Sequence, residues 1–278
     1  MQVFFQKGLF MKENLSARAA LAGARRIVVK VGSSSLTHEN GTMDLLKIET
    51  LVRVLADLQN AGKEMILVSS GAMSVGFARM GETKENKTLA EKQAAAAVGQ
   101  CGLMDIYDRF FSQFSHVIGQ VLITRDVVEN PVRFENARNT FLTLISTGCI
   151  PVVNENDTVS YEEIEFGDND TLSAHVAHLC DADLLVILSD VDGLYTANPR
   201  RDASARFIPE VDAITDEIRA IAGGAGSALG TGGMHSKIEA AEFATEHGTP
   251  VVIASGTDPK ILYRVLASEE VGTLFCAR

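Results

Sequence analysis

Residues 150–170 read IPVVNENDTVSYEEIEFGDND, and the rest of the chain is organised around this stretch. It begins with a short apolar run, Ile150 to Val153, which predicts a buried strand. Asparagine and aspartate follow in two groups, 154–157 and 168–170, and a helical pattern begins at Thr171. In an open α/β sheet, ligands bind in the crevice beyond the carboxyl ends of the strands. The stretch therefore predicts a binding site between a strand end and a helix start.

The rest of the chain alternates strand-like and helix-like segments. Apolar runs of strand type occur at 26–31, 65–68, 117–123, 150–153, 184–188, 251–254 and 273–276. Helical periodicity covers about 44–61, 89–111, 133–147, 171 onward, 212–222, 238–247 and 258 onward. Several strands are apolar throughout, as in sheets buried on both faces. We therefore predict an α/β fold, a three-layer αβα sandwich around a mainly parallel sheet of about eight strands.

Composition narrows the class of protein. The 278 residues carry a net charge of −11, which argues against a nucleic-acid partner because nucleic-acid-binding proteins present a basic surface. No apolar run approaches the ~20 residues of a membrane helix, so we expect no membrane partner and a cytoplasmic location. The four cysteines show neither CxxC nor Cys/His spacing, which gives no sign of a zinc site or a disulfide framework.

The chain divides into a short N-terminal segment and one domain. Lys7, Lys12 and other charged residues interrupt every candidate signal sequence, so we interpret residues 1–25 as a partly ordered N-terminal extension. Residues 26–278 contain no linker or repeat and are expected to form a single domain.

The segment Gly223 to Lys237, GGAGSALGTGGMHSK, predicts a phosphate-binding loop. Glycines let backbone N–H groups approach a polyphosphate, the helix expected next offers its positive end, and Lys237 adds a charge. It is not a Walker A loop, because Met, His and Ser separate the last glycine from the lysine. A flexible surface loop is the other interpretation, and the sequence leaves both open.

Lys30 lies within an apolar strand, next to a Gly/Ser turn. Burial of an ammonium group without a partner is costly, so this lysine either faces solvent at a sheet edge or meets an anion at the end of the strand. The turn that follows favours an anion such as phosphate.

The acidic residues at 168–170 also admit two interpretations. Aspartates commonly cap helices, and we expect either Asp168 or Asp170 to cap the helix that begins at Thr171. The two polar groups of residues 154–170 exceed what capping needs, which indicates a bound cation or an ammonium-bearing ligand. The six histidines show no HxxxH or triad-like spacing, and His235 is expected to face solvent.

Six motifs stand in order along the chain: VVKVGSS (28–34), VSSGA (68–72), IPVVNENDTV (150–159), GDND (167–170), LSDVDGLYT (188–196) and GTGGMHSK (230–237). Together they resemble the motif set of the glutamate 5-kinases in the amino acid kinase family. The resemblance covers residues 26–276 and implies the amino acid kinase fold over 26–278. It also implies a form without the C-terminal PUA domain that many bacterial relatives carry.

The resemblance implies ATP-dependent phosphorylation of the γ-carboxylate of L-glutamate to L-glutamyl 5-phosphate, the first step of proline biosynthesis. The implied substrates are ATP and L-glutamate, with Mg2+ bridging the phosphates and no residue assigned as a metal ligand. The acceptor carboxylate has a reference pKa near ~4.3 and is already ionised at neutral pH, so no general base is required.

Site roles follow from the resemblance by position. The implied catalytic residues are Lys30, Lys237 and Asp170, with Asp170 holding both lysines. The implied substrate-binding residues are Ser70, Gly71, Ala72, Asn154, Asp157 and Asn169. The implied nucleotide-binding residues are Lys30, Ser189, Asp190, Thr231, Gly232, Gly233, Met234, His235, Ser236 and Lys237. His235 departs from the family pattern, where small residues are usual, and this leaves the nucleotide contacts open.

Two alternatives are less well supported. N-acetylglutamate kinases usually have a double glycine where this chain has Gly32 and Ser33, and the acidic group at 154–157 suits a substrate with a free α-amine. A catalytically silent amino-acid sensor would be expected to lack one of the two lysines or Asp170. Family analogy implies a homo-oligomer, a dimer or tetramer. The pathway suggests inhibition by proline at or near the glutamate site, through the loop between Asn156 and Gly167.

Overall fold

Eight strands form one central sheet in the computed structural model, which describes residues 16–83, 85–160, 169–199, 202–222 and 233–278. The strands are β1 (Arg26–Val31), β2 (Glu64–Val68), β3 (Ile118–Ile123), β4 (Ile150–Glu155), β5 (Leu184–Ser189), β8 (Glu210–Val211), β9 (Val251–Ser255) and β10 (Thr273–Phe275). Their order is β3-β4-β2-β1-β5-β9-β10-β8, and all neighbours pair in parallel except β9 and β10. The predicted mainly parallel sheet of about eight strands is confirmed, with β1 at its centre.

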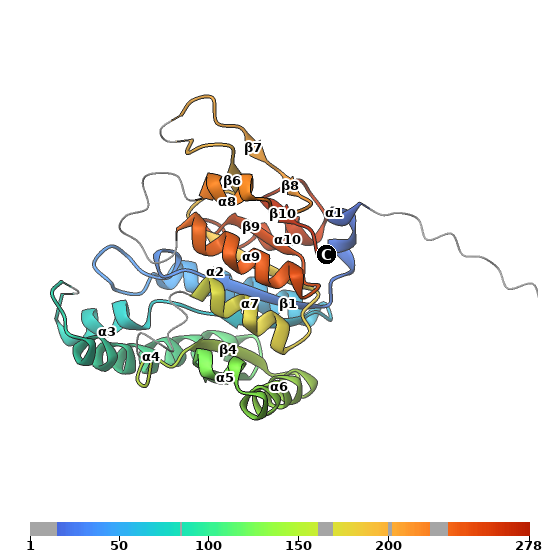
Figure 1. Cartoon of the computed structure of the whole chain (residues 1–278). Helices are drawn as coiled ribbons and strands as arrows, with labels where there is room; N and C mark the ends of the chain where they lie inside the picture. Colours follow the sequence, from blue (N-terminus) through green and yellow to red (C-terminus); the bar gives the residue numbers. More distant parts are fainter. Residues whose placement is uncertain (1–15, 84, 161–168, 200–201, 223–232) are drawn as a thin grey trace, which may run out of the picture.

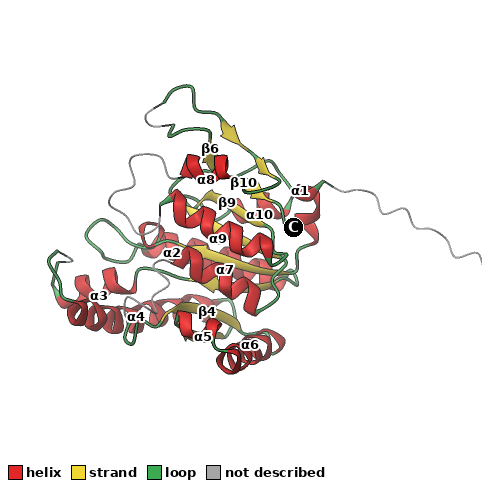
Figure 2. Ribbon diagram, in the orientation of Figure 1, coloured by secondary structure: helices red, strands yellow, loops and turns green. Residues whose placement is uncertain are grey.

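Helices cover both faces of this sheet (Figures 1 and 2). They are α1 (Ala17–Ala20), α2 (Leu45–Asn60), α3 (Ala72–Met80), α4 (Leu89–Gln113), α5 (Arg125–Glu129), α6 (Pro131–Ser146), α7 (Asn169–Leu179), α8 (Asp216–Ala222), α9 (Met234–Glu246) and α10 (Ile261–Leu266). The short strands β6 (Leu194–Tyr195) and β7 (Phe207–Ile208) pair with each other in a separate hairpin. Within the described residues, every helix is too short or too polar to cross a lipid bilayer.

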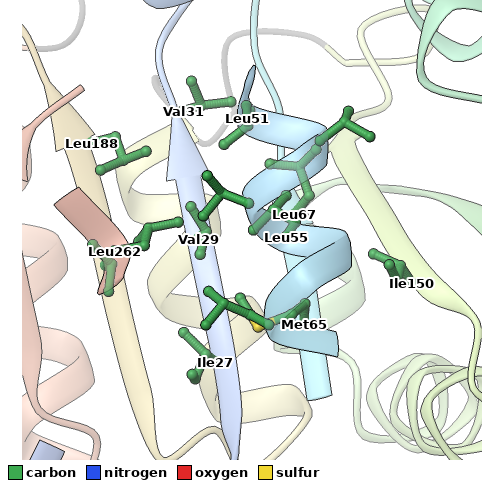
Figure 3. Close-up of a cluster of buried hydrophobic side chains, with 14 of the residues drawn as sticks. Ile27, Val29, Val31, Leu51, Leu55, Met65, Leu67, Ile150, Leu188 and Leu262 are labelled. Atoms are coloured by element: carbon green, nitrogen blue, oxygen red, sulfur yellow. The ribbon is translucent and has the colours of Figure 1, made fainter. Parts of the chain in front are cut away.

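The hydrophobic core has two parts, one on each face of the sheet. Ile27, Val29 and Val31 of β1 point to the face covered by α2, α4 and α10, where they meet Leu55 of α2 and Leu262 of α10 (Figure 3). Val28 points to the opposite face, which is covered by α6, α7 and α9. Successive side chains of a strand alternate between faces, so Lys30 lies on the same face as Val28. The strand pattern therefore directs Lys30 toward α7 and α9.

Several predicted boundaries were wrong by a few residues. The helix predicted from Thr171 begins at Asn169, which places Asp170 in its first turn, where it does not act as the preceding cap. Met234 to Lys237 were predicted as loop, but they form the first turn of α9, because no helix breaker follows Gly233. The final strand pairs antiparallel to β9, and residues 207–208, which no predicted strand covered, form β7.

The N-terminal residues from 16 onward pack against the domain. Arg18 is buried, and its guanidinium donates hydrogen bonds to the backbone carbonyls of Glu269, Val271 and Gly272 at 3.0–3.2 Å and of Pro209 at 2.6 Å. Leu21 belongs to the core beside α2 and α10. The described part of the predicted extension is therefore continuous with the domain, and the boundary at residue 25 stays a prediction.

Candidate active site

The loops that follow four parallel strands meet at one edge of the sheet. The turn after β2 contacts the turn after β1, because a Cβ atom added to Gly71 would lie 3.6 Å from the Cβ of Ser33. The turn after β9 contacts those after β1 and β5, because a Cβ on Gly256 would lie 3.0 Å from Ser35 Oγ and 3.4 Å from the Ser189 carbonyl oxygen. Gly71 itself adopts a positive φ of 93° at the start of α3, a conformation that favours glycine.

Three charged side chains lie buried at this edge. Lys30 of β1 forms an ion pair with Asp170 Oδ1, and Lys237 Nζ of α9 lies 2.9 Å from Asp170 Oδ2. The exposed fractions of the residues are 6% for Lys30, 5% for Lys237 and 0% for Asp170. Of the two environments considered for Lys30, a solvated sheet edge is wrong because β1 lies at the centre of the sheet. The structure thus brings together the three residues for which the family resemblance implied catalytic roles.

The two lysines determine the charge state of Asp170. Burial alone would raise the pKa of Asp170, but the ammonium groups of Lys30 and Lys237 outweigh burial and hold this pKa below its ordinary value of 3.8. One carboxylate and two ammonium groups leave a net positive charge in a site from which water is largely excluded. The amino ends of α7 and α9 add their positive dipole ends at the same place. This edge is therefore suited to bind an anion.

A network of amide and hydroxyl groups lies beside the charged group. Asn169 Nδ2 donates hydrogen bonds to Ser70 Oγ at 3.0 Å, to Asn154 Oδ1 at 2.8 Å and to the Ser69 carbonyl at 2.5 Å. Ser70 and Asn169 are half-buried and Asn154 is buried. Asp157 is half-buried in the turn after β4, while Gly71 and Ala72 form the entry to α3. Each residue predicted to bind the substrate therefore lies on β4, on α7, at the start of α3 or in the turns after β2 and β4.

Gln100 is a member of this network that the sequence did not single out. Its Oε1 accepts a hydrogen bond of 2.9 Å from Asn154 Nδ2. Gln100 lies on α4, which touches α3 backbone to backbone: a Cβ on Gly99 would lie 1.7 Å from the Ala72 carbonyl oxygen, and one on Gly76 would lie 1.7 Å from the Ala95 carbonyl oxygen. The two glycines permit the approach that brings Gln100 to Asn154. The only sign of this close approach in the sequence was Gly99, a glycine within a helical pattern.

The predicted nucleotide residues are only partly described. Ser189 is buried at the end of β5 and its hydroxyl lies 3.2 Å from the carboxylate of the exposed Asp190. Ser236 Oγ donates to Asp170 Oδ2 at 3.0 Å. His235 is exposed, as expected, and its ring lies 3.4 Å from Glu239 one turn along α9. Gly233 and Met234 begin α9, whereas Thr231 and Gly232 lie outside the described residues.

Residues 25–255 match the amino acid kinase family. The chain belongs to this family. Within the amino acid kinases it is similar to glutamate 5-kinases from several bacteria. It is 52% identical over 265 residues to that of Clostridium perfringens, covering 94% of this chain and 98% of that protein. It is 56% identical over 259 residues to that of Carboxydothermus hydrogenoformans, covering 93% of this chain and 69% of that protein.

Solved structures of two other kinases share the fold. The UMP kinase of Ureaplasma parvum superimposes with a TM-score of 0.63 at 12% identity, covering 91% of this chain and 99% of that one. The isopentenyl phosphate kinase of T. acidophilum gives a TM-score of 0.64 at 18% identity, covering 90% and 99%. These likenesses confirm the predicted amino acid kinase fold.

Proposed function

We propose that this amino acid kinase transfers the γ-phosphoryl group of ATP to the γ-carboxylate of L-glutamate, giving L-glutamyl 5-phosphate in the first step of proline biosynthesis. The observation that carries the proposal is the buried group of Lys30, Asp170 and Lys237 beside the Asn169 network. The identity of about half of all positions with glutamate 5-kinases supports the choice of glutamate among the substrates of this family.

The charged group supplies what phosphoryl transfer needs. The reaction depends mainly on positioning and on neutralising the charge that spreads over the transferred phosphoryl group. Lys30 and Lys237 approach Asp170 from a strand and from a helix, so their ammonium groups are held before substrate arrives. We assign these lysines to the phosphoryl oxygens and Asp170 to holding the lysines. The ionised acceptor carboxylate attacks phosphorus directly, and ADP leaves.

Glutamate binds, in this proposal, beside the network of Asn154 and Asn169. Ser70 and the backbone N–H groups of Gly71 and Ala72 are available at the amino end of α3, where the helix dipole favours a carboxylate. Asp157 receives the α-ammonium group. A free α-amine is therefore part of what the site recognises.

The nucleotide binds at the ends of β5 and α9 in this proposal, near Ser189, Asp190 and the 231–237 segment. Mg2+ fits the site as an ion carried by ATP, because both oxygens of Asp170 already contact lysine ammonium groups. Mg2+ is usually held by substrate phosphates, waters and one or two carboxylates, and it would neutralise phosphate charge when bound. Among the described carboxylates, Asp190 at the end of β5 is exposed and accessible to such an ion.

The test compares acceptors directly. ATP turnover with Mg2+ is measured with L-glutamate, with N-acetyl-L-glutamate and without acceptor, and the acyl phosphate is trapped with hydroxylamine. We expect hydroxamate with L-glutamate alone. If hydroxamate formed only with N-acetyl-L-glutamate, the chain would be an N-acetylglutamate kinase. If it formed with neither acceptor, the chain would be a catalytically silent amino-acid sensor.

Three finer features belong to the same proposal: a cytoplasmic location, assembly into a dimer or tetramer, and inhibition by proline at or near the glutamate site. The loop to which the sequence assigned the proline response lies mostly outside the described residues. Velocity measured across millimolar proline should fall, and a flat curve would reject inhibition. Light scattering of the purified chain should give a mass of two or four subunits.

A further inference from the structure

A pocket lies among α5, α6, α7 and α9. It is separate from the catalytic edge, the edge of the sheet where Lys30, Asp170 and Lys237 meet. Its volume is about 390 Å³, within the range typical of small-molecule sites. Its wall is largely aromatic and is formed by Phe134, His175, His178, Phe243 and His247. The sequence shows no histidine motif, yet the fold gathers three of the six histidines here. The spacing of these residues in the sequence is what indicates that they can gather: residues 175 and 178 share one face of α7, and residue 243 lies one helical turn before residue 247.

The rings form a continuous surface. The His175 and Phe243 ring centroids lie 4.1 Å apart, those of His178 and His247 4.4 Å, and those of Phe243 and His247 4.2 Å in a stacked arrangement. Burial lowers the pKa of His175 to about 4, aided by the positive charge of Arg125 and by that of His178 and His247 when these are protonated. Burial also lowers the pKa of His178. At neutral pH these two imidazoles are therefore uncharged and behave as aromatic walls.

Two opposite charges lie on the α5 side of the pocket. Arg125 is half-buried, and among the described residues its guanidinium forms no hydrogen bond or ion pair. Glu129 lies one helical turn further along α5 and also lines the pocket, yet these two residues do not pair with each other. Other arginines of this face do have partners: Arg133 binds Asp126 and Arg138 binds Asp181. Arg125 is thus positioned to bind a carboxylate from solution.

We propose that this pocket binds a small aromatic carboxylate, with its ring against Phe243 and the histidines and its carboxylate on Arg125. A volume of about 390 Å³ suits a ligand the size of one amino acid better than a nucleotide or a peptide. Offset or tilted stacking on aromatic rings favours a flat ring over an aliphatic chain of similar size. An α-ammonium group on the ligand would meet Glu129, so an aromatic amino acid is one source of this chemistry.

The pocket is connected to the catalytic edge through two helices. α7 starts with Asn169 and Asp170 at the edge and carries His175 into the pocket, five residues or about 7.5 Å along the axis. α9 starts with Lys237 in its first turn and carries Phe243 and His247 into the pocket. The two helices pack side by side (Figure 1). A ligand bound against both helices changes the spacing of Asp170 and Lys237 and therefore the rate of phosphoryl transfer. This effect on the rate rests on the proposed kinase activity, whereas binding of the ligand does not.

Fluorescence titration tests the binding. The chain contains no tryptophan, so indole emission excited where tyrosine does not absorb comes from the ligand alone. Indole-3-propionate added to the intact chain should give a saturable change that cyclohexanepropionate does not compete away. Arg125→Gln and Phe243→Leu should each weaken binding at least ~10-fold, the loss of about 1.4 kcal/mol. Arg109→Gln, an exposed arginine paired with Asp105 on α4, should leave it unchanged.

Each outcome bears on a separate step. An unsaturable signal, or equal affinity in Arg125→Gln, would overturn the pocket proposal, and efficient competition by cyclohexanepropionate would overturn ring recognition. Tighter binding of L-tryptophan than of indole-3-propionate would assign the ligand to the aromatic amino acids, whereas weaker binding would assign a simple acid. Saturating ligand should change the kcat of hydroxamate formation in the parent chain and not in Arg125→Gln. Binding without any glutamate-dependent turnover would refute the kinase and leave the pocket standing.

Discussion

Two groups of three charges in this molecule have mirror-image compositions and opposite surroundings. In one, the carboxylate of Asp170 lies between two ammonium groups, and its side chain is 0% exposed. In the other, the guanidinium of Arg219 on α8 lies between the carboxylates of Asp216 and Glu242, and its side chain is 43% exposed. Each group places one charge between two opposite charges, so the main difference between them is their exposure to water.

Water decides what each group can do. Exposed ion pairs gain little because solvent and salt screen them, and ordering the side chains offsets the gain. Buried charges are expensive to desolvate, and removing one partner leaves the others uncompensated. In the proposed function, the buried group presents its net positive charge to a ligand in a site that is shielded from water. The comparison predicts large effects at Asp170 and very small ones at Arg219.

Asp170→Asn should have the largest effect. It leaves two buried ammonium groups without their carboxylate, so the free energy of unfolding should fall by about 3 kcal/mol or more. Glutamate-dependent hydroxamate formation should drop at least ~100-fold, because neither lysine is then held in place. Chemical denaturation and steady-state assays measure the two losses. Retention of both stability and activity would show that the group is not the charged centre of the site.

Lys30→Met should separate catalysis from stability. Methionine fills a similar volume, and Lys237 still neutralises Asp170, so unfolding should change less than in Asp170→Asn. The kcat should fall ~100- to 1,000-fold, as when one transition-state donor is removed. Lys47→Met is the control, because this lysine is 40% exposed and pairs with Asp44 on the surface. A large KM effect with unchanged kcat would contradict the role at the transferred phosphoryl group.

The pH dependence of the unfolding free energy should reveal the ionisation of Asp170 between its two lysines. The pKa of Asp170 is lower in the folded protein, so its contribution is complete above the unfolded value and is lost as pH falls through the folded value. The difference in unfolding free energy between the parent chain and Asp170→Asn should stay constant from about pH 8 to about pH 5 and shrink below about pH 4. If the difference in unfolding free energy persisted undiminished to about pH 3, the two lysines would not be lowering the pKa of Asp170 in the folded protein.

Gln100→Ala should give an intermediate effect on substrate binding. Loss of one hydrogen bond to Asn154, worth about 0.5–1.5 kcal/mol, should raise the KM for glutamate ~3- to 10-fold with little change in kcat. Gln113→Ala, exposed at the end of the same helix, is the matched control. An unchanged KM would remove Gln100 from the positioning of Asn154.

Arg219→Gln should have the smallest effect. The exposed pairs with Asp216 and Glu242 are screened, so the denaturation midpoint and the rate of hydroxamate formation should both stay at their parent values. A clear loss of stability would show that exposure alone does not separate the two groups of charges.

The sequence was sufficient where local pattern sets the structure. Apolar runs placed β1 and β5 within a residue of their observed ends. The helical pattern predicted from about residue 44 matches α2, where the Asp44 side chain accepts a hydrogen bond from the Lys47 backbone N–H as the cap. The local sequence pattern did not decide whether Lys30 lies at a solvated sheet edge or meets an anion at the end of its strand. It depends on the order of strands, which is fixed by pairing between segments far apart in the chain.

The parts that the sequence missed depend on distant contacts. Gln100 resembles any polar residue of an alanine-rich helix until the glycines of α3 and α4 bring the two backbones together. The histidine pocket needs α7 and α9 side by side, and neither helix alone shows it. The family resemblance implied catalytic roles for Lys30, Lys237 and Asp170, and the structure adds how the three meet.

The buried Arg18 has a consequence for how the chain is completed during synthesis. Its guanidinium binds the carbonyls of Glu269, Val271 and Gly272, which follow it by 251, 253 and 254 positions. A ribosome delivers residue 18 at least 251 residues before these acceptors, so the contact closes only after they too have emerged. Until then the amino-terminal helical turn has no place to dock. Arg18 thus reaches its native position long after it has been synthesised.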